Sequence, residues 1–168
     1  MSINFSSIVK KDDQKVKAVY EDCSNFYKVP DASFMSVAGL CFYGNKMVIV
    51  NNKGNWEPPC GHIEKDEKIE EALIREVQEE SNMKVLHYIP IGFLRTLRDD
   101  GEGEYWEYQA RYFCVVKPYG PFISDPAGDI TEIKLIHPKD YKKYFDWGEV
   151  SEHIMQKAFS FLQESKQL

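Results

Sequence analysis

The sequence predicts an α/β fold in which helices cover a mixed β-sheet, and three observations lead to this prediction. Two apolar runs, 34–43 and 47–50, flank the short turn 44–46, which is typical of a β-hairpin. Residues 67–81 have the periodicity of an α-helix. Further strand-type segments and then helical segments follow. This order of elements fits a mixed sheet between helices.

Length and charge limit the range of folds and functions. The chain has 168 residues, of which 43% are hydrophobic, and this is enough for one domain with a closed core. The net charge is −6. Because binding to nucleic acid depends largely on clustered Lys and Arg, stable nucleic-acid binding is not expected. The predicted organisation is an N-terminal arm, 1–32, packed on a domain formed by residues 33–168.

The N-terminal arm mixes charged and apolar residues, and Asp12 to Cys23 predicts a short helix. This arm is expected to cover an edge of the domain or to contact a second copy, so that a monomer and a homodimer both remain open. Residues 1–7 do not resemble a secretion signal, and no stretch approaches the roughly 20 apolar residues of a membrane span. The four cysteines, Cys23, Cys41, Cys60 and Cys114, have no close pairing or metal-ligand spacing, which is typical of reduced thiols in a cytoplasmic protein.

The predicted helix places carboxylates on its apolar side. At about 100° per residue, its apolar residues lie within one arc roughly 140° wide. Glu76 and Glu80 fall inside that arc, and Glu79 lies at its edge. The apolar residues are Ile69, Ala72, Leu73 and Val77, and the opposite, solvated side carries Glu70, Glu71 and Gln78. Carboxylates that face a core need a compensating positive charge, and a divalent metal ion is the simplest candidate.

The segment before the helix supports a metal site. Residues 56–61 form a Pro-rich approach that ends in glycine, which lets the backbone come close to another group. Such a loop can offer a carbonyl oxygen, and Mg²⁺ prefers oxygen ligands. Arg75 lies four residues before Glu79 and can therefore pair with that carboxylate along the helix.

Residues after the helix predict further strands. Segments 84–90 and 91–97 are predicted strands with a bend between them, and an acidic loop, 99–104, follows. In the predicted strand 105–116, charged residues such as Glu107 and Arg111 alternate with aromatic residues, which suits either a nucleobase pocket or ordinary cross-strand packing.

The last part of the chain begins with a Pro- and Gly-rich loop, 118–128, that is a candidate lid. A strand over 129–136 and a short helix over 138–145 follow. Ser151 is predicted to cap the final helix. The four histidines lack zinc-site spacing; His62 adjoins Gly61. Cations that are candidates to meet phosphates are Lys53, Arg95, Arg98 and Arg111.

One pattern in the chain resembles a known family motif. Five residues separate Gly61 from Glu67, and seven more separate Glu67 from the run Arg75–Met83. This spacing resembles the Nudix box, and Trp56 with Pro59 and Gly61 resembles the segment that usually precedes it. Two positions depart from the pattern. Asn82 replaces the closing glycine, where a left-handed helix cap is expected, and Cys60 replaces the first of two glycines.

The resemblance implies a Nudix-type α/β/α sandwich and a MutT-like hydrolase of phosphoric anhydride bonds. Such an enzyme cleaves a nucleoside diphosphate linked to another group, by attack of water in the presence of Mg²⁺ or Mn²⁺. It implies that Glu76, Glu79, Glu80 and the Cys60 carbonyl bind metal and that Glu76 is a candidate to take the proton from water. Arg75 and Glu67 are implied to orient the helix.

The substrate is a small nucleotide, with several alternatives. A nucleoside triphosphate ranks first, followed by a dinucleoside polyphosphate, ADP-ribose or a nucleotide sugar. A nucleotide-sensing binding module without turnover is the alternative from another class. Weaker candidates for substrate binding are Trp56, Glu107, Arg111 and Glu132, and weaker candidates for further metal or base groups are Glu104, Glu107, Asp129 and Glu132.

Overall fold

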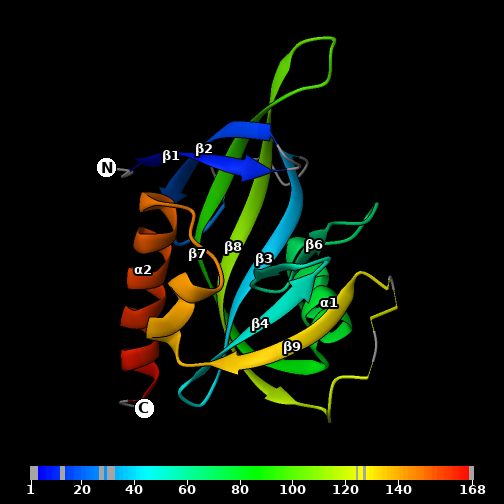
Figure 1. Cartoon of the computed structure of the whole chain (residues 1–168), viewed down its shortest axis with the longest axis vertical. Helices are drawn as coiled ribbons and strands as arrows, with labels where there is room; N and C mark the ends of the chain where they lie inside the picture. Colours follow the sequence, from blue (N-terminus) through cyan, green and yellow to red (C-terminus); the bar gives the residue numbers. More distant parts are fainter. Residues whose placement is uncertain are drawn as a thin grey trace.

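The computed structural model describes residues 4–11, 14–26, 29, 33–123, 125–126 and 128–166. It confirms the predicted α/β architecture: helix α1 (Ile69–Ser81) and helix α2 (Glu149–Lys166) pack on opposite faces of one large sheet (Figure 1). None of the helices in the described part of the chain is both long enough and apolar enough to cross a membrane.

Among the described residues the sheet has nine strands, and seven of them follow the order β1-β2-β7-β8-β3-β4-β5. Strand β6 pairs with β3, and β9 pairs with β4. The sheet is mixed because β3 and β8 run parallel, whereas every other pair in the described part of the chain is antiparallel. The bounds are β1 Asn4–Lys11, β2 Gln14–Asp22, β3 Phe34–Tyr43, β4 Lys46–Asn52, β5 Asn55–Glu57, β6 Cys60–His62, β7 Met83–Asp99, β8 Glu104–Pro118 and β9 Ile130–Ile136.

Alternation along the central strands divides the core into two halves, one on each face of the sheet. Ala110 and Tyr112 of β8 contribute to the half that contains α1, whereas Phe113 contributes to the half that contains α2. In β3, Val37 packs on the α1 side and Leu40 on the α2 side. The predicted alternation of β8 is therefore confirmed.

Helix α1 has defined caps at both ends. At its start, the backbone N–H of Lys68 donates to Glu71 Oε2 at 3.0 Å. At its end, Asn82 adopts the left-handed conformation, with φ of 54° and ψ of 37°, and its N–H donates to the Gln78 carbonyl at 2.8 Å. The prediction that Asn82 serves as a left-handed cap in place of glycine is confirmed, because Asn tolerates this conformation better than most residues.

The predicted helix over Asp12 to Cys23 is wrong. Residues 14–22 form strand β2, which pairs with β1 and β7, and Asp12 and Asp13 lie outside the described residues. Within β2, Lys15 and Lys17 are exposed and Val16, Ala18 and Tyr20 are buried. A repeat of two residues is the period of a half-buried strand, so the alternation was a strand signal.

Two smaller expectations also change, and two others are confirmed. Ser151 is not the cap of α2: the helix begins at Glu149, and the buried Ser151 hydroxyl accepts from the Trp147 N–H at 2.9 Å. The two strands predicted over 84–97 form the single strand β7, with an irregular register between Pro90 and Gly92 in place of the bend. The short helix after β9 is confirmed as the 3₁₀ helix η2 (Pro138–Lys143). All four cysteines are free thiols, as expected.

Candidate active site

Strand β6 brings the backbone close to the carboxylate side of α1, and Gly61 is the point of contact. A Cβ atom placed on Gly61 would lie 2.1 Å from the Cδ atom of Glu76. No side chain fits in that space. Glycine is therefore required at this position by the close approach of Glu76, and the approach fixes the distance between β6 and α1.

Glu80 is the most buried carboxylate of the helix, with 8% of its surface exposed. Its Oε2 atom accepts a hydrogen bond from the Cys60 N–H at 3.0 Å. That N–H therefore points away from β3, the strand with which β6 pairs. Because the N–H and C=O of one residue point to the same side of a strand, the Cys60 carbonyl also faces away from β3. The carbonyl oxygen and the Glu80 carboxylate thus share one edge of β6.

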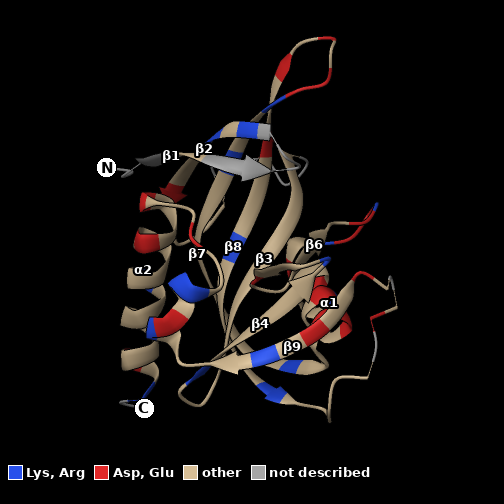
Figure 2. Ribbon diagram, viewed as in Figure 1, with Lys and Arg blue, Asp and Glu red and all other residues tan. Residues whose placement is uncertain are grey.

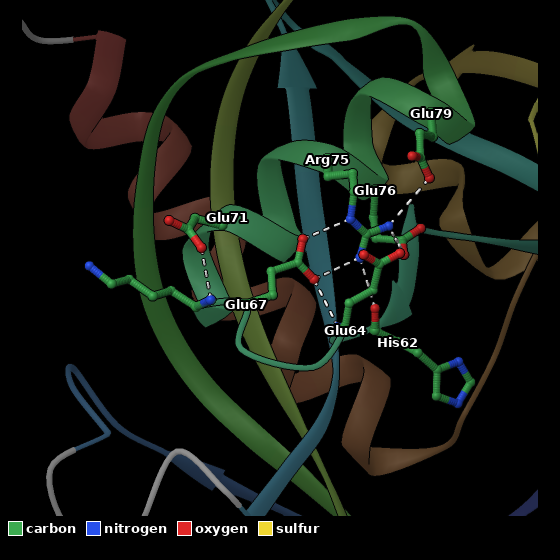
Figure 3. A network of polar contacts seen from close by, with 8 residues as sticks. His62, Glu64, Glu67, Glu71, Arg75, Glu76 and Glu79 are labelled. Atoms are coloured by element: carbon green, nitrogen blue, oxygen red, sulfur yellow. Dashed lines mark hydrogen bonds and ion pairs between the residues drawn. The ribbon is translucent and has the colours of Figure 1, made fainter.

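Arg75 connects the remaining carboxylates (Figure 3). Its guanidinium donates to both oxygens of Glu67 at 2.7 and 2.9 Å, to Glu76 Oε1 at 2.6 Å and to Glu79 Oε2 at 3.3 Å. It also donates to the carbonyl of His62 at 3.0 Å. The arginine therefore joins three carboxylates of the candidate site to the end of β6.

Burial shapes the ionisation of these groups. Burial raises the pKa of Glu80 to about 8, the negative charge of Glu76 acts in the same direction, and the hydrogen bond from Cys60 opposes both. Burial also raises the pKa of Glu76, against the effect of its hydrogen bond with Arg75. In contrast, the hydrogen bonds from Arg75 lower the pKa of Glu67. The site therefore holds two desolvated carboxylates that a bound cation would stabilise.

The raised pKa of Glu80 predicts that the metal-free protein loses stability with rising pH. An unfolded chain has a Glu pKa near 4.5, so the stabilisation linked to the bound proton is fully present below pH 4.5 and is lost as the pH rises to about 8. Denaturant unfolding in EDTA should show this loss in the wild type and a smaller loss in Glu80→Gln. Equal pH dependence in both proteins would contradict the prediction, and Glu71→Gln, which changes an exposed glutamate of the same helix, is the matched control.

The chemistry of these donors fits a hard divalent cation. The candidate ligands are the carboxylates of Glu76, Glu79 and Glu80 and the Cys60 carbonyl. All of them are oxygen donors, which Mg²⁺ and Mn²⁺ prefer. Among the residues that the structure describes, no three His, Cys, Asp or Glu side chains are already grouped to hold an ion. Arg75 holds Glu76 and Glu79, whereas Glu80 turns to the Cys60 N–H. A metal site that includes Glu79 would therefore require rotation of its side chain, which is 36% exposed.

Two acidic residues near the site were not among the predicted site residues. The negative charges of Glu57 and Asp125 are close enough to Glu80 to raise its pKa. Glu57 accepts hydrogen bonds from Asn52 at 2.9 Å and from the Cys60 thiol at 3.8 Å. Asp125 is buried in the loop after β8 and accepts from the Ile130 N–H at 3.1 Å. The sequence carries one signal for Glu57, its place in the 56–61 approach, and no signal for Asp125.

The predicted substrate residues lie in different places. Arg111 is buried on the α2 face of β8, whereas Glu107 lies nearer the β7–β8 turn and pairs with Arg98 at 3.5 Å. Trp56 packs against Tyr144, with ring centroids 5.9 Å apart. Of the weaker candidates, Glu104 and Glu132 are exposed, and Asp129 pairs with Lys53 at 3.2 Å. Glu70, which was expected to be solvated, instead accepts from the Tyr112 hydroxyl at 2.8 Å.

A groove of about 730 Å³ runs along the outer side of α1. Arg75 and Glu79 line it, and the loop after β8 contributes Ile123 and Pro126. This loop is fastened to the end of the helix, because the side chain of Asn82 donates to the Pro121 carbonyl at 2.9 Å. Acidic residues lie along α1 beside this loop (Figure 2). The predicted role of the loop as a lid stays a prediction.

Comparison with known proteins gives one family and one fold. The family model of the NUDIX domain matches residues 34–158. A pyrophosphohydrolase of Bacillus subtilis, BsRppH, superposes with a TM-score of 0.70 at 20% identity, covering 93% of this chain and 96% of that chain. The NUDIX domain of Shewanella oneidensis NrtR, solved with ADP ribose, has a TM-score of 0.60 at 17% identity, with coverage of 81% and 92%. An Ap4A hydrolase of C. elegans has a TM-score of 0.54 at 16% identity, with coverage of 77% and 97%. The comparison with curated proteins finds no significant match.

Proposed function

Because this chain belongs to the Nudix hydrolase family, we propose that it is a Mg²⁺-dependent pyrophosphohydrolase acting on a nucleoside diphosphate linked to another group. The observation that supports the proposal most is the junction of β6 and α1. There, Glu76 faces Gly61, and Glu80 binds the backbone beside the Cys60 carbonyl. Manganese is the alternative ion.

We assign roles to the residues of this junction as follows. Glu76, Glu79, Glu80 and the Cys60 carbonyl would hold the ion, whose positive charge would offset the negative charge of the phosphates and make attack by water easier. Glu76 is the candidate base because burial raises its pKa and so makes its carboxylate a better proton acceptor. Arg75 and Glu67 orient the helix through their paired hydrogen bonds.

The first substrate to test is a nucleoside triphosphate, followed by dinucleoside polyphosphates, ADP-ribose and nucleotide sugars. Purified protein should be incubated with each compound and Mg²⁺, with and without EDTA, and phosphate measured after coupled cleavage of the products. Turnover that EDTA abolishes would support the proposal. Turnover that EDTA leaves unchanged, or no turnover of any compound, would contradict it.

A second function, nucleotide binding without turnover, is favoured by one observation. Arg75 engages both Glu76 and Glu79, and these carboxylates are therefore turned toward an arginine of their own helix. Tight binding of a nucleotide in the same panel, with no product in the presence of Mg²⁺ or Mn²⁺, would identify such a module. Product formation would exclude it.

Glu67→Gln is expected to reduce turnover by about fivefold. Glutamine keeps a hydrogen-bond acceptor for Arg75 but loses the charge, and weakening a charge-assisted hydrogen bond by about 1 kcal/mol corresponds to a factor of about five. Steady-state kinetics and a melting curve of the same sample would check this. A loss as large as that of a ligand variant would instead place Glu67 among the groups that bind the ion.

A further inference from the structure

Arg111 is a buried cation that lacks an acidic partner among the described residues. It is 5% exposed, and its Nε atom is buried without a hydrogen-bond acceptor. No described carboxylate lies within ion-pair distance of its guanidinium. Because a buried charge is costly unless it is paired, an arginine in this state indicates a missing anionic partner.

The position of Arg111 relates it to the candidate active site. Ala38 of β3 pairs with Cys60 on one side and with Arg111 on the other. Residues paired across a sheet project from the same face, so Cys60 and Arg111 belong to one row on the α2 face, about 10 Å apart at two strand spacings. The long side chain of Arg111 spans much of that distance. Burial lowers the pKa of Arg111, and the negative charge of the nearby Glu57 opposes this effect.

The neighbours of Arg111 in this row differ in size on its two sides. On the β3 side lies Ala38, which has a single methyl group. On the β7 side lies Gly92, where a Cβ atom would come within 2.4 Å of the Tyr20 hydroxyl. Tyr20 therefore fills the side toward β7. On the side toward β6, the paired residues of the row are the small Ala38 and Cys60.

Trp147 orients the guanidinium. Its ring lies 5.0 Å from the Cζ atom of Arg111, in the range of a cation–π interaction. Trp147 is half-buried and belongs to the connection between η2 and α2, so a loop residue forms part of the cover over Arg111. A stacked guanidinium keeps its N–H donors in its own plane, where a phosphate can accept two of them at once.

We propose that Arg111 binds an anionic phosphoryl oxygen of the substrate, on the α2 side of the row that leads to Cys60. The inference rests on the proposed function, because it assigns a binding residue to the same site. Arginine forms paired hydrogen bonds with phosphate, and a phosphate chain is the part of every proposed substrate that carries negative charge. The ion held by α1 and the guanidinium of Arg111 would then contact different parts of the substrate's phosphate chain.

The test compares three variants in EDTA, so that it does not depend on turnover. Arg111→Met removes the charge and keeps the unbranched apolar stem, and Arg111→Lys keeps the charge without the planar donors. Arg95→Met is the matched control. Arg95 is also a sequence-based candidate to meet phosphates, but it pairs with Tyr108, which packs on the α1 face of the sheet, whereas Arg111 lies on the α2 face. Its Nε atom is likewise buried without a hydrogen bond, and its Cζ atom lies 4.6 Å from the centre of the Trp106 ring. Melting temperature is measured for each protein alone, with inorganic pyrophosphate, with ATP and with adenosine.

We expect pyrophosphate and ATP, but not adenosine, to raise the melting temperature of the wild type and of Arg95→Met. Arg111→Met should lose this shift while melting at or above the wild-type temperature when free, because it no longer buries an unpaired charge. Arg111→Lys should keep a reduced shift. An unchanged shift in Arg111→Met, or a shift produced equally by adenosine, would overturn the inference.

Kinetics with Mg²⁺ separates this inference from the proposed function. If the wild type turns over nucleotides, Arg111→Met and Arg111→Lys should raise KM by about tenfold or more, with a smaller change in kcat. Wild-type KM values in both variants would overturn the role of Arg111 and leave the proposed function intact. If Arg111→Met melts well below both the wild type and Arg95→Met, the guanidinium is a structural counter-charge for Glu57, and the inference is also overturned.

Discussion

Glu80→Gln is expected to lower Mg²⁺-dependent turnover by about a hundredfold or more and to leave the fold intact. Glutamine has the shape of glutamate, and its amide oxygen can still accept the Cys60 N–H that Glu80 Oε2 accepts at 3.0 Å. What it removes is the negative charge that would hold the ion. Because burial already penalises that charge, the metal-free variant should be at least as stable as the wild type at neutral pH.

The measurement is kcat and the Mg²⁺ concentration for half-maximal rate, together with a melting curve. Glu71→Gln is the control, because it removes an equal charge from an exposed position on the first turn of the same helix. Glu79→Gln should behave like Glu80→Gln in turnover. A folded Glu80→Gln protein with the wild-type rate would remove Glu80 from the site and, with it, the main support for a metal-dependent mechanism.

The helix and its carboxylates could be predicted because both depend on local spacing. Helical periodicity places Glu80 beside Val77 and Leu73, and all three are buried in the structure. The caps of α1 are local in the same sense, and Asn82 takes the left-handed conformation that its position requires. The spacing of Arg75 and Glu79 also predicted their contact, at 3.3 Å.

Other parts of the site depend on contacts between distant segments, which spacing does not reveal. The carboxylate closest to Arg75 after Glu76 is Glu67, eight residues away, and the helix start lies between them. Asp125 reaches the neighbourhood of Glu80 only through the course of the loop after β8. The isolation of Arg111 depends on Ala38 and Gly92, residues of two other strands. The surroundings of Arg111 arise from sheet order, and the sequence alone left that order open.

The misassigned segment 12–23 has a different cause. Its alternating Lys and Val residues satisfy a strand pattern, but the segment was also compatible with a short amphipathic helix. Pairing with β7 decides between them: Ala18 lies opposite Thr96 and Tyr20 opposite Leu94. Tyr20 then packs over Gly92 and donates to the Ile91 carbonyl at 2.7 Å. Tertiary pairing therefore overrides the local preference, as is common for short segments.

Gly61→Ala is expected to lower turnover by about a hundredfold, since a displacement of about 1 Å in a catalytic group can cost that much. The added methyl group would start 2.1 Å from the Glu76 Cδ atom and 2.3 Å from both of its oxygens. Either the carboxylate must leave its position or β6 must move away from α1. Both outcomes also separate Glu76 from the Cys60 carbonyl. Overpacking of this kind should cost about 1–3 kcal/mol of unfolding free energy.

A double-mutant cycle shows whether Glu76 is the group that Gly61 accommodates. In Glu76→Ala the carboxylate is absent, and Gly61→Ala should then cost little further stability, so that the two changes are strongly non-additive. Gly120→Ala is the control for replacing glycine, because its nearest neighbour to a new Cβ would be Asn82 Nδ2 at 3.7 Å. If the losses are additive, the added methyl group clashes with atoms other than the Glu76 carboxylate. The close approach of Glu76 would then not explain why residue 61 is glycine.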